Sequence, residues 1–296
     1  MYISLNGNII KKEDARISPY DHGFLYGIGL FETIRIYHRH PFLFYDHIDR
    51  LNEGLKMIGI QLNKKKEEWF EDIQELLISN KMNDAYVRIN VSAGVHELGL
   101  NADDYTNPTV IIFVKPLPSP SRDEKEGIIL KTARNSPEAV KRLKSHHFLN
   151  NMLAKREIGN DIKKEGIFLN EEGKLAEGIV SNIFWAKDGI VYTPSVETGI
   201  LNGITRQFVI ELLKKRNLFI CEGSFEPSSL LSADEAFMTN SIQEIVPFAS
   251  VENINFPGNS GEITQILLND YKICRTELWS YKQLSRRSEP GAECCK

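Results

Sequence analysis

Residues 141–152 read Lys-Arg-Leu-Lys-Ser-His-His-Phe-Leu-Asn-Asn-Met, and the fourth of these residues, Lys144, carries the most reactive amine that the sequence suggests. A lysine that is shielded from water and faces other cations can lose its proton near neutral pH. Its amine can then attack a carbonyl carbon and form a Schiff base. Most lysines are solvated, so this stretch taken alone favours an ordinary surface lysine. Other stretches of the chain decide between the two interpretations.

The composition is that of a globular protein. The chain has 296 residues, of which 42% are hydrophobic and 26% are charged. This length most simply holds two domains, each large enough to bury its own core. The formal net charge is −4, and no basic stripe is interleaved with aromatic residues. Nucleic acid is therefore not expected as a partner.

Nothing in the sequence predicts a membrane or secreted protein. The longest apolar run, Val110–Val114, is far shorter than the roughly 20 residues that a membrane-spanning helix needs. The start of the chain lacks the pattern of a secretory signal. The four cysteines have no C-x-x-C spacing and the seven histidines do not converge, so neither a disulfide framework nor a metal site is expected. We expect a cytoplasmic protein with no membrane partner.

Periodicity predicts an N-terminal α/β domain over residues 1–118, a linker at 119–125, a C-terminal domain over 126–284 and a disordered tail at 285–296. In the first domain, Asn6-Gly7 predicts a hairpin turn. The first domain is predicted to contain strands at 30–37, 85–92 and 108–114, and helices at 44–60 and around Trp69. The second is predicted to contain strands at 127–132, 166–169, 179–185, 190–192, 218–221 and 236–238, and helices at 148–159, from about 204 to 215 and at 262–284.

The strand at residues 30–37 has an unusual face. Period-two alternation places Phe31, Thr33 and Arg35 together, with Glu32 on the opposite face. An aromatic ring, a hydroxyl and a guanidinium would then lie side by side, although a solvated polar face is the more ordinary interpretation. The glycines that precede this strand are not a dinucleotide fingerprint, because Glu32 takes the place of the third glycine and a strand follows.

Two features in the second domain could bind a charged ligand. Glu177 precedes an apolar run, where a buried carboxylate is costly unless it meets a cation such as a protonated pyridine nitrogen. Asn202 is a plausible N-cap of the helix that follows it. The first amides of that helix, with the hydroxyl of Thr205, would form an anion-binding site. An ordinary capped helix gives the same pattern.

Four stretches, read together and in order, resemble the fold-type IV, pyridoxal-phosphate-dependent enzymes of the class IV aminotransferase family. They are residues 21–35 (DHGFLYGIGLFETIR), 142–145 (RLKS), 176–184 (AEGIVSNIF) and 199–206 (GILNGITR). The resemblance covers nearly the whole chain short of its tail. It implies two α/β domains joined by a short linker with the cofactor between them, and a homodimer whose sites take residues from both subunits.

The resemblance also implies roles for particular residues. Lys144 would carry pyridoxal 5'-phosphate covalently, and Glu177 would pair with the pyridine nitrogen of that cofactor. The cofactor phosphate would lie on the amides of Ile204 and Thr205, with Arg50 as its cationic clamp.

Further residues are implied by the same resemblance. The turn Thr239-Asn240-Ser241 matches the family's second polar turn, which makes Asn240 and Ser241 candidate contacts for the phosphate and Asn240 one for the substrate. Phe31 would contact the substrate as well, and Thr33 would aid proton delivery.

Within the family, residues 31–35 (FETIR) and 144–152 (KSHHFLNNM) are most similar to aminodeoxychorismate lyases of Bacillus type. Such a lyase removes pyruvate from a small-molecule substrate, 4-amino-4-deoxychorismate, by β-elimination. It leaves 4-aminobenzoate for folate biosynthesis, and Lys144 would remove the proton. The alternatives are a branched-chain or D-amino-acid aminotransferase on the same fold, or a non-catalytic protein that binds the cofactor.

Residues 92–100 contain no arginine. D-amino-acid aminotransferases place an arginine and a histidine in this stretch to hold the substrate carboxylate, so its composition argues against D-amino-acid transamination. Some lyases carry an arginine there too. The residues that bind the substrate carboxylates are therefore left unassigned by the resemblance.

Overall fold

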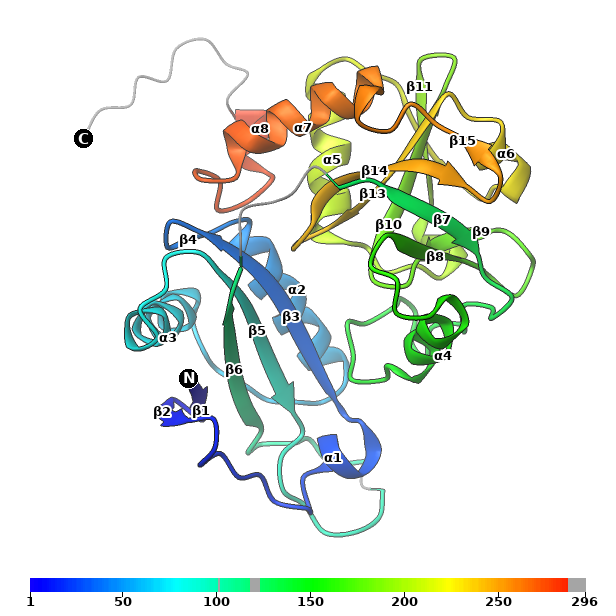
Figure 1. Ribbon diagram of the computed structural model, residues 1–296. Coiled ribbons are helices and arrows are strands. Elements are labelled where there is room, and N and C mark those ends of the chain that lie inside the picture. The colour runs from blue at the N-terminus through cyan, green and yellow to red at the C-terminus, as the bar shows by residue number, and fades with distance from the viewer. Residues whose placement is uncertain (101, 118–122, 287–296) are drawn as a thin grey trace. The chain divides into compact units, whose positions relative to one another are not determined.

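The computed structural model describes residues 1–100, 102–117 and 123–286 (Figure 1). The chain forms two compact units, one of Met1–Ser119 with Leu143–Leu149 and the other of Pro120–Arg142 with Asn150–Lys296. The prediction assigned residues 126–284 to the second domain without interruption, whereas Leu143–Leu149 belong to unit 1. Residues 123–125 of the predicted linker belong to unit 2, where strand β7 begins at Lys125. Part of the predicted linker (residues 119–122) and most of the predicted tail (residues 287–296) lie outside the described residues.

Unit 1 is built on an antiparallel sheet in the order β2-β1-β6-β5-β3-β4. Asn6 and Gly7 both have positive φ, which confirms the predicted hairpin turn between the first two strands. The strands are β1 (Tyr2–Leu5), β2 (Asn8–Lys11), β3 (Gly29–Tyr37), β4 (His40–Pro41), β5 (Ala85–Ser92) and β6 (Thr109–Pro116).

The helices of unit 1 are α1 (His22–Tyr26), α2 (Phe44–Met57) and α3 (Lys66–Ser79). The two longer helices pack against the sheet face that carries Ile34, Val87 and Val114, which lie opposite one another on neighbouring strands and are buried (Figure 1). The opposite face of β3 carries Phe31 and Thr33, as the alternation predicted. The helices thus bury one side of the sheet and leave the other side for these residues.

Unit 2 contains a mixed sheet in the order β12-β11-β10-β13-β14-β7-β8-β9, with β15 paired to β14. Its strands are β7 (Lys125–Ile129), β8 (Lys164–Leu169), β9 (Leu175–Gly178), β10 (Asn182–Lys187), β11 (Ile190–Pro194), β12 (Ile220–Gly223), β13 (Glu235–Asn240), β14 (Glu244–Val251) and β15 (Ile254–Asn255). Its helices are α4 (Leu149–Ile158), α5 (Ile204–Lys215), α6 (Pro227–Leu231), α7 (Glu262–Cys274) and α8 (Gln283–Arg286), with 3-10 turns at η1 (Val196–Thr198) and η2 (Gly258–Ser260).

Each unit combines a sheet with packed helices, which confirms the predicted α/β class. In unit 2, α5 and α7 pack on β13 and β14 (Figure 1). The sheet core is formed by fully buried apolar side chains, including Ile167, Ile183, Met238 and Phe248. Of the helices that the structure describes, none combines the length and the apolar character that crossing a bilayer requires.

Two predicted elements of unit 2 are wrong in their extent, and one strand was not predicted. The run 179–185 is not one strand, because a turn closed by the amide of Gly178 and the carbonyl of Ser181 separates β9 from β10. The helix predicted over 262–284 ends at Cys274, and Gln283 Oε1 then accepts the amides of residues 279 and 280 in place of helical bonds. Strand β14 was not predicted, and it contains Pro247, a residue that is uncommon in central strands.

Candidate active site

Lys144 lies in a segment that runs beside the first residues of β3 in unit 1. The amide of Phe31 donates to the carbonyl of Lys144 (2.9 Å), and the amide of His146 donates to the carbonyl of Gly29 (3.0 Å). A side chain at position 29 would meet the ring of His146, because a Cβ there would lie 2.4 Å from its Cε1. Glycine at this position therefore lets the Lys144 segment pair closely with the strand.

The Lys144 amine lies over the ring of Phe31, with Nζ 4.6 Å from the ring centroid. The same ring is contacted by Arg88 on β5, whose guanidinium carbon is 3.6 Å from the centroid. Thr33 and Arg88 stand directly opposite each other on the paired strands. Lys144 and Arg88 thus contact the ring of Phe31 on one face of the sheet, and Thr33 lies on the same face.

Arg88 is the residue of this group that sequence reasoning missed. Its Nε donates to Asn90 Oδ1 (3.2 Å), and no residue of the described chain accepts a hydrogen bond from its terminal amino groups. Burial, reinforced by the positive charge of Arg88, lowers the pKa of His146 to about 4, so this imidazole is neutral at pH 7. The sequence carried no signal for Arg88, because the strand register that sets it across from Thr33 is a property of the fold.

Arg50 lies on the other face of β3, where it forms a buried ion pair with Glu32. Arg50 donates from Nε to Oε1 (2.7 Å) and from a terminal amino group to Oε2 (2.8 Å) of Glu32. Nδ1 of His47 makes a third contact to Oε2 (2.6 Å). Burial alone would raise the pKa of Glu32, but the charge of Arg50 and the contact with His47 outweigh it and hold this pKa well below its ordinary value. The predicted arginine is thus fixed by a carboxylate that the sequence analysis did not connect with it.

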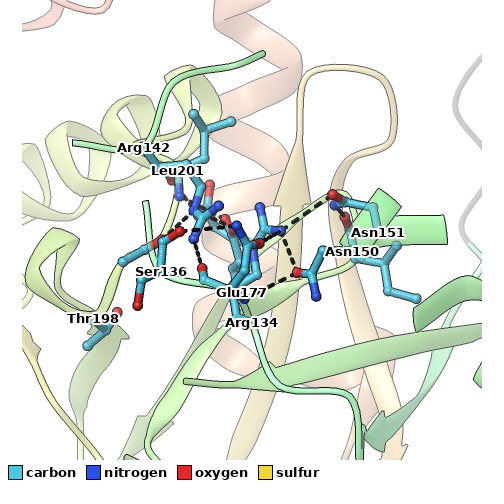
Figure 2. A network of polar contacts seen from close by, with 12 residues as sticks. Arg134, Ser136, Arg142, Asn150, Asn151, Glu177, Thr198 and Leu201 are labelled. Carbon is cyan, nitrogen blue, oxygen red and sulfur yellow. Dashed lines mark hydrogen bonds and ion pairs between the residues drawn. The ribbon is translucent and has the colours of Figure 1, made fainter. Parts of the chain in front are cut away.

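Glu177 lies within β9 of unit 2 and is buried. Its Oε1 accepts a hydrogen bond from Nε of Arg134 (2.8 Å), and its Oε2 accepts one from the amide of Leu201 (2.9 Å) (Figure 2). Nε of Arg142 is 3.8 Å from Oε1. Each carboxylate oxygen has two lone pairs, so Oε2 can accept a further hydrogen bond. The cation partners that the buried carboxylate required are two arginines that the sequence analysis did not single out.

Ile204 and Thr205 begin helix α5, as predicted, but the predicted N-cap is wrong. The N-cap is Gly203, and no side chain caps the helix. Asn202 Oδ1 instead accepts from a terminal amino group of Arg206 (3.1 Å). A Cβ at position 203 would lie 2.1 Å from Asn182 Oδ1, which explains the glycine. The first amides of α5 are therefore not satisfied by a side chain, and such a helix start favours a bound anion.

Strand β13, which contacts α5, and the turn after it carry further hydroxyl groups. Ser241 Oγ lies 3.5 Å from Thr205 Oγ1. The hydroxyl of Thr239 is buried and has no hydrogen-bond partner among the residues that the structure describes. A buried hydroxyl without a partner is costly, and a phosphate oxygen would satisfy it. These groups fit a phosphorylated ligand.

Asn240 has a structural part in the same turn. Its Oδ1 accepts the amides of Ile242 (3.0 Å) and Gln243 (2.7 Å), and its Nδ2 donates to the side chain of Gln243 (3.0 Å). This hydrogen bonding shapes the turn that presents Ser241. The predicted contacts of Asn240 with a ligand stay a prediction.

Residues 29–251 match the model of the family described as amino-transferase class IV. Aminodeoxychorismate lyase of Bacillus subtilis is 50% identical over 273 residues, which cover 91% of this chain and 93% of the lyase. A putative branched-chain-amino-acid aminotransferase of Methanocaldococcus jannaschii is 36% identical, covering 95% of this chain and 99% of that protein.

Solved structures of the same kind match the fold. The crystal structure of the Escherichia coli branched-chain amino acid aminotransferase has a TM-score of 0.86 at 28% identity, and it covers 95% of this chain and 97% of that one. The T.th. branched-chain amino acid aminotransferase, solved with pyridoxamine 5'-phosphate, has a TM-score of 0.83 at 28% identity and covers 93% and 94% of the two chains.

Replacing Glu32 by glutamine should destabilise the protein by about 3 kcal/mol at pH 7, because it leaves Arg50 and His47 without their buried anion. The effect has a definite pH dependence. The pKa of Glu32 is lower in the folded protein than its ordinary value of 4.5, so the stability that the carboxylate contributes is complete above that value and is lost as the pH falls below it. Urea unfolding of both proteins, followed by tryptophan fluorescence across this range, measures the difference.

The matched control is Glu75→Gln, which changes an exposed carboxylate on α3 and should shift stability by less than about 0.5 kcal/mol. A Glu32→Gln protein as stable as the parent at neutral pH would show that the pair does not hold Arg50. A stability difference that does not shrink in acid would show the same.

Proposed function

The chain belongs to the amino-transferase class IV family, and on this premise we propose that it is a 4-amino-4-deoxychorismate lyase that releases pyruvate and 4-aminobenzoate, a precursor for folate biosynthesis. The observation that carries the proposal is the likeness to the Bacillus subtilis lyase along nearly the whole of both chains. An aminotransferase for branched-chain amino acids is the second candidate, which the likeness to the Methanocaldococcus jannaschii protein supports.

Pyridoxal 5'-phosphate is the proposed cofactor, and when bound it supplies a ring that accepts the electrons of a bond broken beside the substrate amine. The chain's own residues fit this group. Lys144 offers the amine for its aldehyde. The uncapped amides of Ile204 and Thr205 suit its phosphate, and the remaining lone pair on Glu177 Oε2 suits its protonated ring nitrogen.

In the proposed reaction, Nζ of Lys144 accepts the proton from C4, the carbon of the substrate that bears the amine. As that C–H bond breaks, the C–O bond on the neighbouring carbon breaks as well, and the enolpyruvyl group leaves. The departing group takes up a proton and becomes pyruvate, while the ring that remains becomes aromatic. The hydroxyl of Thr33 lies on the same sheet face as Phe31 and is the proposed donor for that proton. Aromatisation makes the elimination strongly favourable.

Arg88 is the proposed partner for a carboxylate of the substrate. The substrate carries two carboxylates, and the guanidinium lies over the same ring as the Lys144 amine. Arginine binds carboxylates in a bidentate manner through the amino groups that face away from its stem. Both cations contact the ring of Phe31, which is the proposed apolar contact for the substrate.

We further propose that the protein is a cytoplasmic homodimer, as the resemblance implies. Large apolar side chains are exposed on α1 and on the connection that follows β5, among them Phe24 (69% exposed) and Leu98 (67% exposed). A second copy of the chain would bury such side chains. Light scattering should then report twice the chain mass of 33.8 kDa, and a single chain mass would refute the dimer.

Purified protein loaded with the cofactor should convert 4-amino-4-deoxychorismate into equal amounts of pyruvate and 4-aminobenzoate without any keto-acid acceptor. Coupled detection of pyruvate and fluorescence of 4-aminobenzoate measure the two products. Amino transfer to 2-oxoglutarate from branched-chain amino acids, in place of this elimination, would support the aminotransferase. Cofactor absorbance without turnover in either assay would indicate a non-catalytic cofactor-binding protein.

Replacing Arg88 by glutamine should raise KM for the substrate by roughly 10- to 100-fold, because a charge-assisted hydrogen bond to a carboxylate contributes about 1.5–3 kcal/mol. The absorbance of the bound cofactor should not change. Lys115→Gln is the matched control, since Lys115 is a cation over the ring of Tyr86 on the same sheet. A KM within twofold of the parent in the Arg88 variant would exclude this residue as the carboxylate partner.

A further inference from the structure

The Glu177 carboxylate is the centre of a hydrogen-bond network that extends well beyond the carboxylate itself (Figure 2). Arg134 donates from Nε to Glu177, from one terminal amino group to Asn150 Oδ1 (2.8 Å), and more weakly to Asn151 Oδ1 (3.4 Å). Arg142 donates to the carbonyls of Gly199 and Asn135. The side chains of Glu177, Arg134 and Arg142 are each less than a tenth exposed.

Two residues of this network flank Lys144 in the sequence. Arg142 stands two residues before Lys144, and Asn150 stands six residues after it. The residues that flank the segment Leu143–Leu149 in the sequence, Arg142 and Asn150, therefore both belong to the Glu177 network. The segment itself makes backbone hydrogen bonds to β3.

Arg134 is itself held rigidly. Its amide donates to the carbonyl of Leu169 at the end of β8 (2.8 Å), and its guanidinium carbon lies 5.2 Å from the centroid of the Phe168 ring. A planar guanidinium with its donors in a fixed fork sets the plane of the carboxylate that it binds. Because Leu201 holds the second oxygen, the Glu177 carboxylate is fixed at both of its oxygens.

We infer that Arg134 is a positioning residue for the cofactor ring, because it orients the Glu177 carboxylate and ties it through Asn150 and Asn151 to the segment that carries Lys144. The inference rests on the proposed roles of Lys144 and Glu177. It assigns Arg134 no contact with the substrate or the cofactor. Partners that orient metal ligands act in the same way, and their loss commonly weakens binding or activity by 10- to 100-fold.

The test compares Arg134→Met with the parent protein and with Arg216→Met, which removes an arginine–carboxylate pair between the exposed Arg216 and the buried Asp270. Titration of each apoprotein with pyridoxal 5'-phosphate, followed by absorbance, gives its dissociation constant, and thermal unfolding of the apoprotein reports its integrity. We expect Arg134→Met to raise the dissociation constant by roughly 10- to 100-fold and to lower kcat. Arg216→Met should leave both within twofold.

A double-mutant cycle separates positioning from a merely structural effect. In a Glu177→Gln background the Arg134 substitution should change the dissociation constant by less than about threefold, because the group that it orients has been altered. Equal effects in the two backgrounds would overturn the inference, as would an Arg134→Met protein with parental affinity and kcat. Should Arg134→Met not fold, Arg134→Lys keeps the charge but lacks the fork, and the same outcomes in that variant would support or overturn the inference.

The Glu177→Gln protein distinguishes the inference from the function on which it rests. If this variant binds the cofactor and turns over as the parent does, the placement of the ring nitrogen at Glu177 fails and the inference fails with it. If Glu177→Gln is impaired while Arg134→Met is not, the inference alone is overturned.

Discussion

The place of Lys144 is set by main-chain hydrogen bonds to β3 and not by its own side chain. Phe31 and Gly29 exchange hydrogen bonds with residues 144 and 146, so the lysine is brought to the strand by backbone pairing. This pairing requires close approach of the two chains, which Gly29 allows. The same sheet also fixes the position of the Phe31 ring and the strand register that brings Arg88 to it. The chemistry proposed for this protein depends on that short stretch of pairing.

Charge burial is handled in the same manner in both units. Glu32 is paired with Arg50 in unit 1, and Glu177 is paired with Arg134 in unit 2, each through an arginine nitrogen at 2.7–2.8 Å. Such pairs contribute little net stability, because the cost of removing two charges from water offsets their attraction. Breaking one of them by removing a single partner is costly, however. Their value in this protein lies in geometry, since each pair fixes a side chain to which the family resemblance assigns a contact with the cofactor.

Local chemistry explains which features could be read from the sequence. The Asn6-Gly7 turn and the strand at 85–92 were predicted correctly, because a positive-φ turn and a period-two pattern are encoded by neighbouring residues. Asn202 failed as an N-cap, since the choice between Asn202 and Gly203 depends on the distant side chain of Asn182. Arg88 and Arg134 were missed for a related reason. Arg88 lies opposite Thr33 on the neighbouring strand, and Arg134 pairs with Glu177, which is 43 residues away in the chain. No local pattern reveals either arrangement.

We propose that one particular lysine, Lys144, held against β3, carries the cofactor. The measurement that tests it most directly is borohydride reduction of the cofactor-loaded protein, followed by proteolysis and mass spectrometry of the peptides. We expect a phosphopyridoxyl group on the peptide that contains Lys144, and its loss in a Lys144→Ala protein. A stable label on any other lysine, or no label at all in protein that binds the cofactor, would contradict it.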